Sequence, residues 1–169
     1  LGDVYKRQVY QEESYKLNRR IKGVTQISFV LHQKIHLKGF SFAPLQKAYE
    51  KLYASENDAV YGDTFRIEGR EVTGIGNNVT LEFHDMDFGE DGCSSVTICG
   101  RTHNDKDAIH ISFQEGEQET RQLVEFEGTA DDSYRELTFP LKCVKGTKTV
   151  RFIFLPGSNF DFSWVEFHH

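Results

Sequence analysis

The sequence predicts an all-β protein, an antiparallel β-sandwich with a short connecting helix, and three observations support this fold class. Segments such as VTLEFH, residues 79–84, alternate apolar and polar side chains, which is typical of a strand with one buried face. Turn-forming clusters such as GEDG, residues 89–92, separate these segments at short intervals. Aromatic residues make up 13% of the chain and include 14 phenylalanines, which is enough to fill a core between two sheets.

After Ala54 the chain is a series of short segments rich in β-branched and aromatic residues. The further predicted strands are SVTICG (95–100), AIHISF (108–113), QLVEFE (122–127), RELTFPL (135–141) and TVRFIFL (149–155). Helices do not alternate with these strands, as they would around a parallel sheet. We therefore expect one sandwich over residues 54–167, followed by His168 and His169, which are either native or the remnant of an affinity tag.

The end of the predicted sandwich occurs twice in the chain. IKGVTQISFVLHQKIHLKGFSF, residues 21–42, resembles VKGTKTVRFIFLPGSNFDFSWVEF, residues 144–167, with a gap of two residues. The aligned apolar positions are Ile27, Phe29, Leu31, Leu37, Phe40 and Phe42 with Val150, Phe152, Phe154, Phe162, Val165 and Phe167. By alternation, QISFVLH (26–32) and KIHLKGFSF (34–42) predict two short strands. We interpret residues 9–42 as the tail strands of an earlier, truncated module. Two strands alone are marginal in water, so we expect them to pack on the complete module or to pair with another chain by self-association.

Two further segments complete the predicted organisation. Residues 43–53, APLQKAYEKLY, place Leu45, Ala48, Tyr49 and Leu52 on one helical face and predict a short connector helix. Residues 1–8, LGDVYKRQ, look like translated sequencing-adapter sequence of the kind left at broken ends of metagenomic reading frames, and we exclude them from the fold. The true N-terminus and any targeting signal would then be missing, so the sequence leaves the cellular location open.

Composition argues against several classes of partner. The formal net charge is −6 and no basic face is evident, which disfavours nucleic acid as a partner. No apolar run approaches the ~20 residues needed to span a membrane. Cys93, Cys99 and Cys143 form no C-x-x-C pair, so neither zinc nor a disulfide framework is indicated. We expect buried free thiols, with a Cys93–Cys99 bridge as the alternative.

No motif marks the chain as an enzyme. A glycosidase needs two carboxylates at a defined separation, but 26 acidic residues supply such pairs by chance and no pattern selects one. Nucleophile and phosphate-binding motifs are absent from the sequence. The acidic segment that begins at Asp85 does not fit a twelve-residue calcium loop, because its last ligand would be Val96. We therefore expect a chain without catalytic activity.

VTGIGNNVTLEFHDMDFG, residues 72–89, and the ending NFDFSWVEF, residues 159–167, resemble family 6 carbohydrate-binding modules over residues 50–167. The strings YGDTF, TICGR and FIFLPGSNFDF are most similar to modules at the C-terminal end of bacterial glycoside hydrolase family 2 enzymes, the β-galactosidase and β-glucuronidase group. The resemblance implies a jelly-roll sandwich that holds a parent catalytic domain near plant polysaccharide. The alternative is a structural module at an interface of the parent enzyme that has lost sugar binding.

The resemblance also implies a sugar-binding cleft at the loop end of the sandwich, between two aromatic rings that stack on a sugar. The usual ring positions are occupied here by Gly74 and Asp131, with Tyr134 as a neighbouring aromatic residue. The polar residue that completes the cleft is Asn159 or Asp161, depending on where a two-residue difference is placed. Both rings are therefore missing from their usual positions. The alternative contacts are other rings, such as Tyr61, Phe65 or Tyr134, or a second cleft on the concave face of a sheet.

Two further sets of candidate residues follow. Asn77 and Asn78 lie in a predicted turn with positive φ, where either amide is a candidate for sugar contact. The family commonly holds a structural calcium through acids of its first strand and one near its end. Here the resemblance implies Glu56 and Asp58 in the first strand, with Asp161 or Ser163 as the late ligand.

Overall fold

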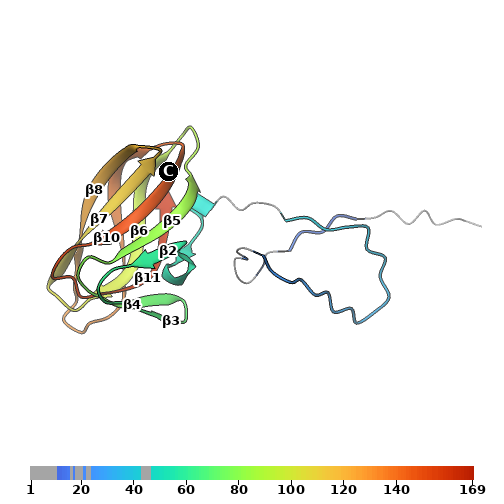
Figure 1. Ribbon diagram of the computed structural model, residues 1–169, viewed down its shortest axis with the longest axis horizontal. Helices are drawn as coiled ribbons and strands as arrows, with labels where there is room; N and C mark the ends of the chain where they lie inside the picture. The colour runs from blue at the N-terminus through green and yellow to red at the C-terminus, as the bar shows by residue number, and fades with distance from the viewer. Residues whose placement is uncertain (1–10, 16, 18–20, 22–23, 43–46) are drawn as a thin grey trace, which may run out of the picture. The chain divides into compact units, whose positions relative to one another are not determined.

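The computed structural model describes residues 11–15, 17, 21, 24–42 and 47–169, and the chain divides into two compact units, Leu1–Ala43 and Pro44–His169. All strands assigned within the described residues belong to the second unit (Figure 1). The adapter-like residues 1–8 lie outside the described residues. Within the described residues, no helix is long and apolar enough to cross a membrane.

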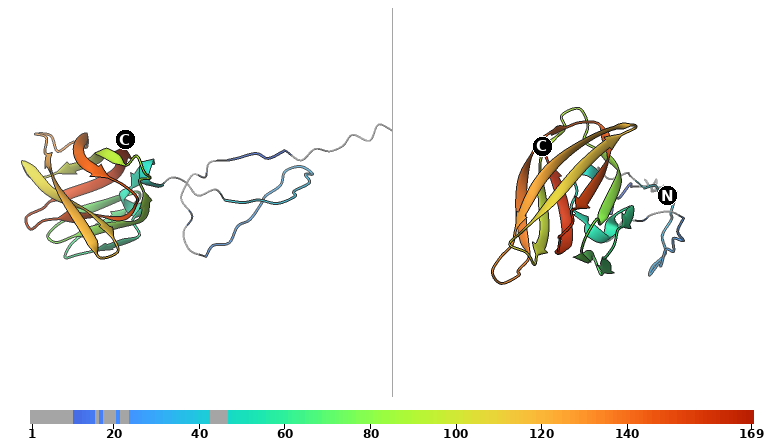
Figure 2. Two further views of the ribbon diagram at one scale, coloured as in Figure 1. Left: turned by 90° about the horizontal axis from the view of Figure 1, so that it is seen from above. Right: turned by 60° about the vertical axis from the view of Figure 1, so that its left-hand side comes forward.

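The second unit is the all-β sandwich that the sequence predicts. Its strands are β1 Leu52–Tyr53, β2 Ala59–Tyr61, β3 Arg66–Glu68, β4 Glu71–Ile75, β5 Thr80–Asp87, β6 Cys93–Thr102, β7 Lys106–Glu115, β8 Gln118–Glu127, β9 Arg135–Val144, β10 Thr147–Phe154 and β11 Phe160–His168. One sheet has the order β3-β4-β11-β6-β9, with β1 also on β11, and the other has the order β2-β5-β10-β7-β8. Every pair is antiparallel, and the two layers face each other (Figure 2).

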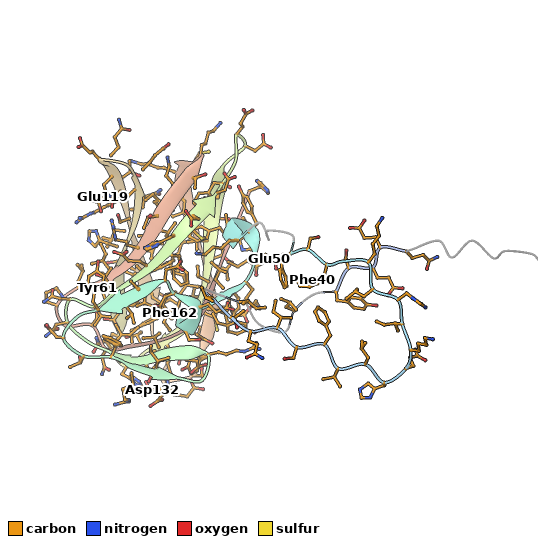
Figure 3. The ribbon with its side chains drawn as sticks, turned by 45° about the vertical axis from the view of Figure 1, so that its right-hand side comes forward. Phe40, Glu50, Tyr61, Glu119, Asp132 and Phe162 are labelled. Carbon is orange, nitrogen blue, oxygen red and sulfur yellow. The ribbon has the colours of Figure 1, made fainter. Side chains whose placement is uncertain are left out.

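Phenylalanine rings fill the space between the two sheets. The fully buried rings are Phe83, Phe88, Phe113, Phe126, Phe152, Phe154, Phe160, Phe162 and Phe167. Phe152 on β10 and Phe162 on β11 meet across the core with ring centroids 5.2 Å apart, and Figure 3 labels Phe162 there. Burying one such side chain contributes about 1.5–3 kcal/mol. A Cβ on Gly100 would lie 2.5 Å from the Phe160 ring, so only glycine lets β6 approach β11 here.

The segment before the sandwich differs from the predicted helix over residues 43–53. Its described part contains only a 3₁₀ turn, η1 Lys47–Tyr49, after which β1 pairs with β11. Ala48 and Leu52 are fully buried in the core. This segment is therefore part of the sandwich, because β1 obtains backbone partners on β11 that a short isolated helix lacks. A second 3₁₀ turn, η2 Ala54–Glu56, follows β1.

The two strands predicted at residues 26–32 and 34–42 are not formed. The described residues 24–42 contain no strand, and side chains such as Ile27 and Phe29 are 40% and 54% exposed. The ring of Phe29 packs on Phe40 instead, with centroids 5.1 Å apart. Apolar alternation alone does not produce a strand when no neighbouring strand completes its hydrogen bonds.

The two C-terminal histidines pack on the sandwich. His168 belongs to β11, and its Nε2 lies 2.8 Å from Thr97 Oγ1. The ring of His169 stacks on Tyr49 at 4.1 Å. Residues 168–169, predicted as a tail or a tag remnant, therefore pack on the sandwich, and their origin stays a prediction.

The three cysteines are free, but the expectation that all of them are buried is wrong for Cys143. Cys93 and Cys99 are buried and Cys143 is exposed. Burial raises the pKa of Cys93 to about 11 and that of Cys99 to about 11. Both buried thiols therefore remain protonated near neutral pH and are poor nucleophiles.

The loops that connect the strands gather at two ends of the sandwich. We call one of them the loop end. It comprises residues 76–79, 103–105, 128–134 and 155–159, where β4, β6, β8 and β10 finish and β5, β7, β9 and β11 begin. Asp132 marks the loop end, and Glu119 lies toward the opposite end (Figure 3). All six residues predicted to contact sugar lie in these loops or in the first residues of the adjoining strands.

Candidate functional site

A buried carboxylate, Asp161, organises the loop end. It is 4% exposed and accepts hydrogen bonds from the backbone N–H of Gly74 at 2.7 Å and from Arg101 Nε at 2.7 Å. His103 Nε2 lies 3.3 Å from the same carboxylate. Burial opposes ionisation of Asp161, but the Gly74 N–H and the Arg101 guanidinium outweigh it and lower the pKa. Asp161 is therefore a buried anion with its partners already in place.

A β-bulge in β4 supplies the first of these contacts. Ile75 pairs with Phe160 and Val72 with Phe162, so two residues of β4 oppose the single residue Asp161. Gly74 has φ +60°, a left-handed conformation that favours glycine. The bulge aims the Gly74 N–H at the carboxylate, which links this glycine to the geometry of the site.

Arg101 connects the buried carboxylate to a ring on the surface. Its guanidinium carbon lies 5.0 Å from the centroid of Tyr134, which is 36% exposed. The Tyr134 hydroxyl donates to Glu71 Oε2 at 2.7 Å, and Ser163 donates to the other oxygen of Glu71 at 3.1 Å. Burial and the Glu71 carboxylate raise the pKa of Tyr134, so its hydroxyl stays a donor. The ring is fixed at its hydroxyl, and one of its faces meets a cation.

His103 extends the same network outward. Its Nδ1 lies 3.2 Å from Asp132 Oδ2, and its ring is thus placed between the exposed carboxylate of Asp132 and the buried one of Asp161. Asp132 has φ +52° and a side chain that is 57% exposed. We call Asp161, Arg101, His103, Asp132 and Tyr134 the loop-end cluster. It presents a ring, a guanidinium, an imidazole and a carboxylate.

A second buried carboxylate holds the loops beneath the cluster. Asp107 is 4% exposed and accepts from Thr102 Oγ1 at 2.6 Å and Asn104 Nδ2 at 3.0 Å. It also accepts from the backbone N–H of Asn159 at 3.2 Å. The turn after β6 is thereby tied to the loop before β11, which keeps His103 in position.

The structure gives the other predicted sugar contacts mainly loop-forming roles. Asn77 Oδ1 accepts from the Gly157 N–H at 2.6 Å, and Asn78 has the predicted positive φ of 56°. Asn159 accepts from the His103 N–H at 2.9 Å through its backbone oxygen. Asp131 accepts from the Ser133 N–H at 3.3 Å, and hydrogen bonds with the Ser133 side chain, the Thr129 side chain and this N–H lower the pKa of Asp131. Asp161 and Tyr134 are thus the two predicted residues that belong to the loop-end cluster.

Sequence reasoning did not select Arg101, His103, Asp132 or Glu71. Arg101 ends the segment TICGR, and His103 opens the turn HNDKD that follows it. A charged residue at the end of a strand, directly before a polar turn, was the available signal. Its buried partner is evident only from the strand register, which places Asp161 opposite Arg101.

The two positions where stacking rings are usual differ in what surrounds them. A Cβ built on Gly74 would lie 3.5 Å from a guanidinium nitrogen of Arg66, so an arginine covers this position. Asp131 is exposed in its loop. Phe65, another ring considered from the sequence, packs against the core. Among the residues that the structure describes, Tyr134 is therefore the aromatic ring of the loop-end cluster, and no second Phe, Tyr or Trp belongs to that cluster.

The outer face of the second sheet is the other candidate surface. A row of side chains crosses its five strands in register: Tyr61, Thr80, Ile153, His110 and Leu123. Tyr61 and Leu123, at the two edges, are 50% and 55% exposed. In the adjacent row Arg151 Nε donates to Glu82 at 2.6 Å. This face offers one exposed ring beside a fixed ion pair.

The predicted calcium ligands already have protein partners. Glu56 accepts from the Tyr53 N–H at 3.1 Å, and Asp58 accepts from Lys47 Nζ at 2.6 Å. Asp161 is held by Arg101. Within residues 11–15, 17, 21, 24–42 and 47–169, no three His, Cys, Asp or Glu side chains are grouped to hold a metal ion. These contacts do not support the structural calcium, which stays a prediction.

Comparison with known proteins identifies the fold. No protein-family model matches the chain, and no curated protein is significantly similar to it. A family 6 module from Clostridium stercorarium in complex with cellobiose is similar at 24% identity and TM-score 0.62, over 72% of this chain and 94% of that one. A family 6 carbohydrate-binding module from Clostridium cellulolyticum in complex with xylose is similar at 21% identity and TM-score 0.62, over 72% of this chain and 98% of that one. A glycoside hydrolase family 43 arabinoxylan arabinofuranohydrolase from Bacillus subtilis, in complex with cellotetraose, is similar at 18% identity and TM-score 0.58. That similarity covers 72% of this chain and 27% of the hydrolase. The second unit is therefore a β-sandwich with the fold of family 6 carbohydrate-binding modules.

Proposed function

We propose that the sandwich is a non-catalytic carbohydrate-binding module that binds sugar at its loop end. The observation that supports this best is the loop-end cluster, in which Tyr134, Arg101, His103 and Asp132 present different chemistry at one place. These side chains are partly exposed, while Asp161 beneath them is buried and fixes Arg101. The fold shared with sugar-bound modules supports the same assignment.

The cluster provides both kinds of contact that a sugar requires. A pyranose has an apolar C–H face that packs on an aromatic ring, and Tyr134 supplies a ring. Its hydroxyls need charged donors and acceptors, which Arg101 and Asp132 supply. Because a second stacking ring is missing, we expect weak binding, with Kd near 1 mM, equivalent to about −4 kcal/mol.

The proposed biological role is to keep a glycoside hydrolase of family 2 near plant polysaccharide. A module without chemistry of its own increases the local concentration of substrate around a tethered catalytic domain. The resemblance of YGDTF and FIFLPGSNFDF to modules of that enzyme group motivates this context. The parent catalytic domain and the polysaccharide are parts of the proposal.

Titration calorimetry with oligosaccharides of xylan, β-glucan, galactan and cellulose tests the assignment. We expect Asp132→Asn and His103→Ala to weaken binding at least about 10-fold, a loss of about 1.4 kcal/mol each. Asn tolerates the left-handed backbone at residue 132, so the first variant should fold normally. Glu117→Gln, in the exposed turn at the opposite end, is the matched control and should bind as the unmodified chain does.

A second pair of variants separates the loop end from the sheet face. Tyr61→Ala removes the exposed ring of the second sheet and leaves the loop-end cluster unchanged. If sugar binding is lost in Tyr61→Ala and retained in Asp132→Asn, the site is on the sheet face and the loop-end assignment is wrong.

The second candidate function is a structural module of the parent enzyme. It is favoured by one observation, the Arg66 guanidinium at the position of a usual stacking ring. Absence of binding to every oligosaccharide at millimolar protein would contradict the carbohydrate-binding proposal and leave this alternative.

A further inference from the structure

Residues 24–42 match the β10–β11 pair at every core position. The matched residues are Ile27, Phe29, Leu31, Ile35, Leu37, Phe40 and Phe42, which align with Val150, Phe152, Phe154, Phe160, Phe162, Val165 and Phe167. The seven residues of β10 and β11 are at most 1% exposed. Their seven counterparts are between 40% and 58% exposed. The first copy therefore has the side chains of a sandwich core without the core.

The match includes an irregularity that general apolarity does not explain. Leu37 and Phe40 are three residues apart, which breaks the period of two expected for a strand. Phe162 and Val165 show the same break, and the structure gives its cause as a shift of register against β6 between Phe162 and Trp164. Residues 35–42 thus encode the bulge of β11 as well as its apolar face.

Apolar side chains of the two halves of the first copy are in contact. Phe29 and Phe40 have ring centroids 5.1 Å apart. The counterpart of Phe40 in the sandwich is Val165, so this ring pair has no direct equivalent between β10 and β11. The two halves of the segment therefore contact each other through their apolar side chains, although no strand is formed within its described residues.

Both strands of this pair need neighbours on both sides. In the second unit β10 lies between β5 and β7, and β11 lies between β4 and β6. In the second unit these two strand positions are already occupied by β10 and β11, so residues 24–42 cannot take them. We infer that residues 24–42 are the last two strands of a second sandwich of this same fold, whose remaining strands come from another polypeptide segment. The partner of residues 24–42 is then a sandwich that lacks its last two strands, so that each of its sheets has one vacant strand position and its core is open.

A complementation experiment tests this inference directly. The probe is residues 47–146, the second unit without β10 and β11, unfolded in urea and diluted into an excess of the full chain. We expect a one-to-one complex in native mass spectrometry and at least about 100-fold slower amide exchange over residues 27–42. Phe29→Asp in the full chain should abolish both effects. Ser28→Asp, at the position of the outward-facing Arg151, is the matched control and should leave them unchanged.

The outcomes of this experiment are distinct. A synthetic peptide of residues 147–169 is the positive control, because it restores the native strands of the probe. Rescue by that peptide but not by the full chain would overturn the inference. A complex in which residues 27–42 remain unprotected would overturn it too, because β10 and β11 of the full chain would then have been exchanged. Dimers of the full chain alone, formed through residues 24–42, would identify a second copy as the partner and also overturn it.

A graft within the full chain provides an independent test. Residues 24–31 replace residues 147–154 and residues 35–42 replace residues 160–167, with the loop of residues 155–159 retained. A second graft contains the same residues slipped by one position, which turns the apolar side chains outward. We expect cooperative thermal unfolding of the sandwich for the first graft only. Equal behaviour of the two grafts would overturn the inference.

Discussion

Residues 24–42 and the β10–β11 pair have one apolar pattern in two surroundings. In the sandwich, Phe152 is completely buried and contacts rings of β5 and β11. In the first unit its counterpart Phe29 is 54% exposed and belongs to no strand. The same apolar pattern therefore forms a core only where β4, β5, β6 and β7 complete the hydrogen bonds of its strands and enclose its side chains. Pattern determines which face is buried, and neighbouring strands determine whether burial occurs.

The outward-facing residues of the two copies differ in chemical character, whereas the aligned core positions are apolar in both copies. The second copy has Arg151, Asp161 and Trp164 where the first has Ser28, His36 and Gly39. Each of the three engages another element: Arg151 the Glu82 carboxylate, Asp161 the loop-end cluster and Trp164 the ammonium of Lys51. The apolar positions that form the core are therefore repeated in the first copy, whereas the residues that contact other elements on the outer face occur only in the sandwich.

The largest difference between the copies is expected for a core truncation. Phe152→Ala should lower the free energy of unfolding by about 3–5 kcal/mol, because it leaves a cavity in a fully buried site. Phe29→Ala should change it by less than about 0.5 kcal/mol, because Phe29 is half exposed in the other unit. Urea denaturation followed by the fluorescence of Trp164, the single tryptophan, measures both.

The paired design has an internal check. The slope of the denaturation curve should be equal in the two variants, since both should unfold the same sandwich. A loss above 1 kcal/mol in Phe29→Ala would show that residues 24–42 contribute to the stability of the second unit, and the comparison would have to be abandoned.

The core was predictable from the sequence because it depends on alternation. Val79, Leu81 and Phe83 are fully buried, as the pattern of VTLEFH predicts. The strands predicted within residues 26–42 are not formed, and of the helix predicted over residues 43–53 the described part forms only the turn Lys47–Tyr49. Both depend on partners that alternation does not specify: the first copy has none within its described residues, and Leu52 finds one in Val165.

The next largest effect is expected at Glu82, the partner of Arg151. Burial opposes ionisation of Glu82, but hydrogen bonds with Arg151, His84 and Tyr61 outweigh it and lower the pKa from 4.5 to about 2. At about 1.4 kcal/mol per pKa unit, the ionised form contributes up to about 3 kcal/mol. Glu82→Gln should therefore cost about 2–3 kcal/mol at pH 7, and Arg151→Ser, which installs the residue of the first copy, should cost a similar amount.

The pH dependence of Glu82 has a definite sign. Because its pKa is lower in the folded state, its contribution is complete above pH 4.5 and is lost as the pH falls from 4.5 through about 2. The difference in unfolding free energy between the unmodified chain and Glu82→Gln should therefore shrink over that interval. Urea titrations at pH 7, 4 and 2.5 measure it. A difference that stays constant would show that the ion pair does not set the stability of this face.

A smaller effect is expected at Asp161, where the first copy has His36. Asp161→His removes the acceptor of the Gly74 N–H and the partner of Arg101. Since the Arg101 side chain is 35% exposed and can reach water, we expect a loss of about 1–2 kcal/mol, below that of a fully buried pair. Asp161→Asn retains an acceptor for Gly74 and should lose less. Thermal unfolding at pH 7 ranks the two, and the opposite ranking would contradict the role of the bulge contact.

The site was less predictable from the sequence than the fold. Asp161 and Tyr134 were found through a resemblance that indicated the loop end. Arg101 was not, because its importance depends on the pairing of β6 with β11, which brings it opposite a residue 60 positions away. Single-sequence patterns report neighbours along the chain, whereas this cluster is assembled from four separate strands and loops.

The smallest effect separates charge from packing at Trp164, where the first copy has Gly39. Lys51 Nζ lies 3.8 Å from the centroid of the indole ring, and the ring is only 8% exposed although it lies on the outer face. Lys51→Met retains an aliphatic cover and removes the charge, so its cost should be about 0.5–1 kcal/mol, the typical value of an exposed cation–π contact. Lys51→Ala removes both and should also shift the Trp164 emission to longer wavelength. If the free energy of unfolding of Lys51→Met equals that of the unmodified chain while that of Lys51→Ala is lower, the lysine stabilises this face through its aliphatic stem alone. The outward side of β11 is then stabilised by packing, as its inward side is.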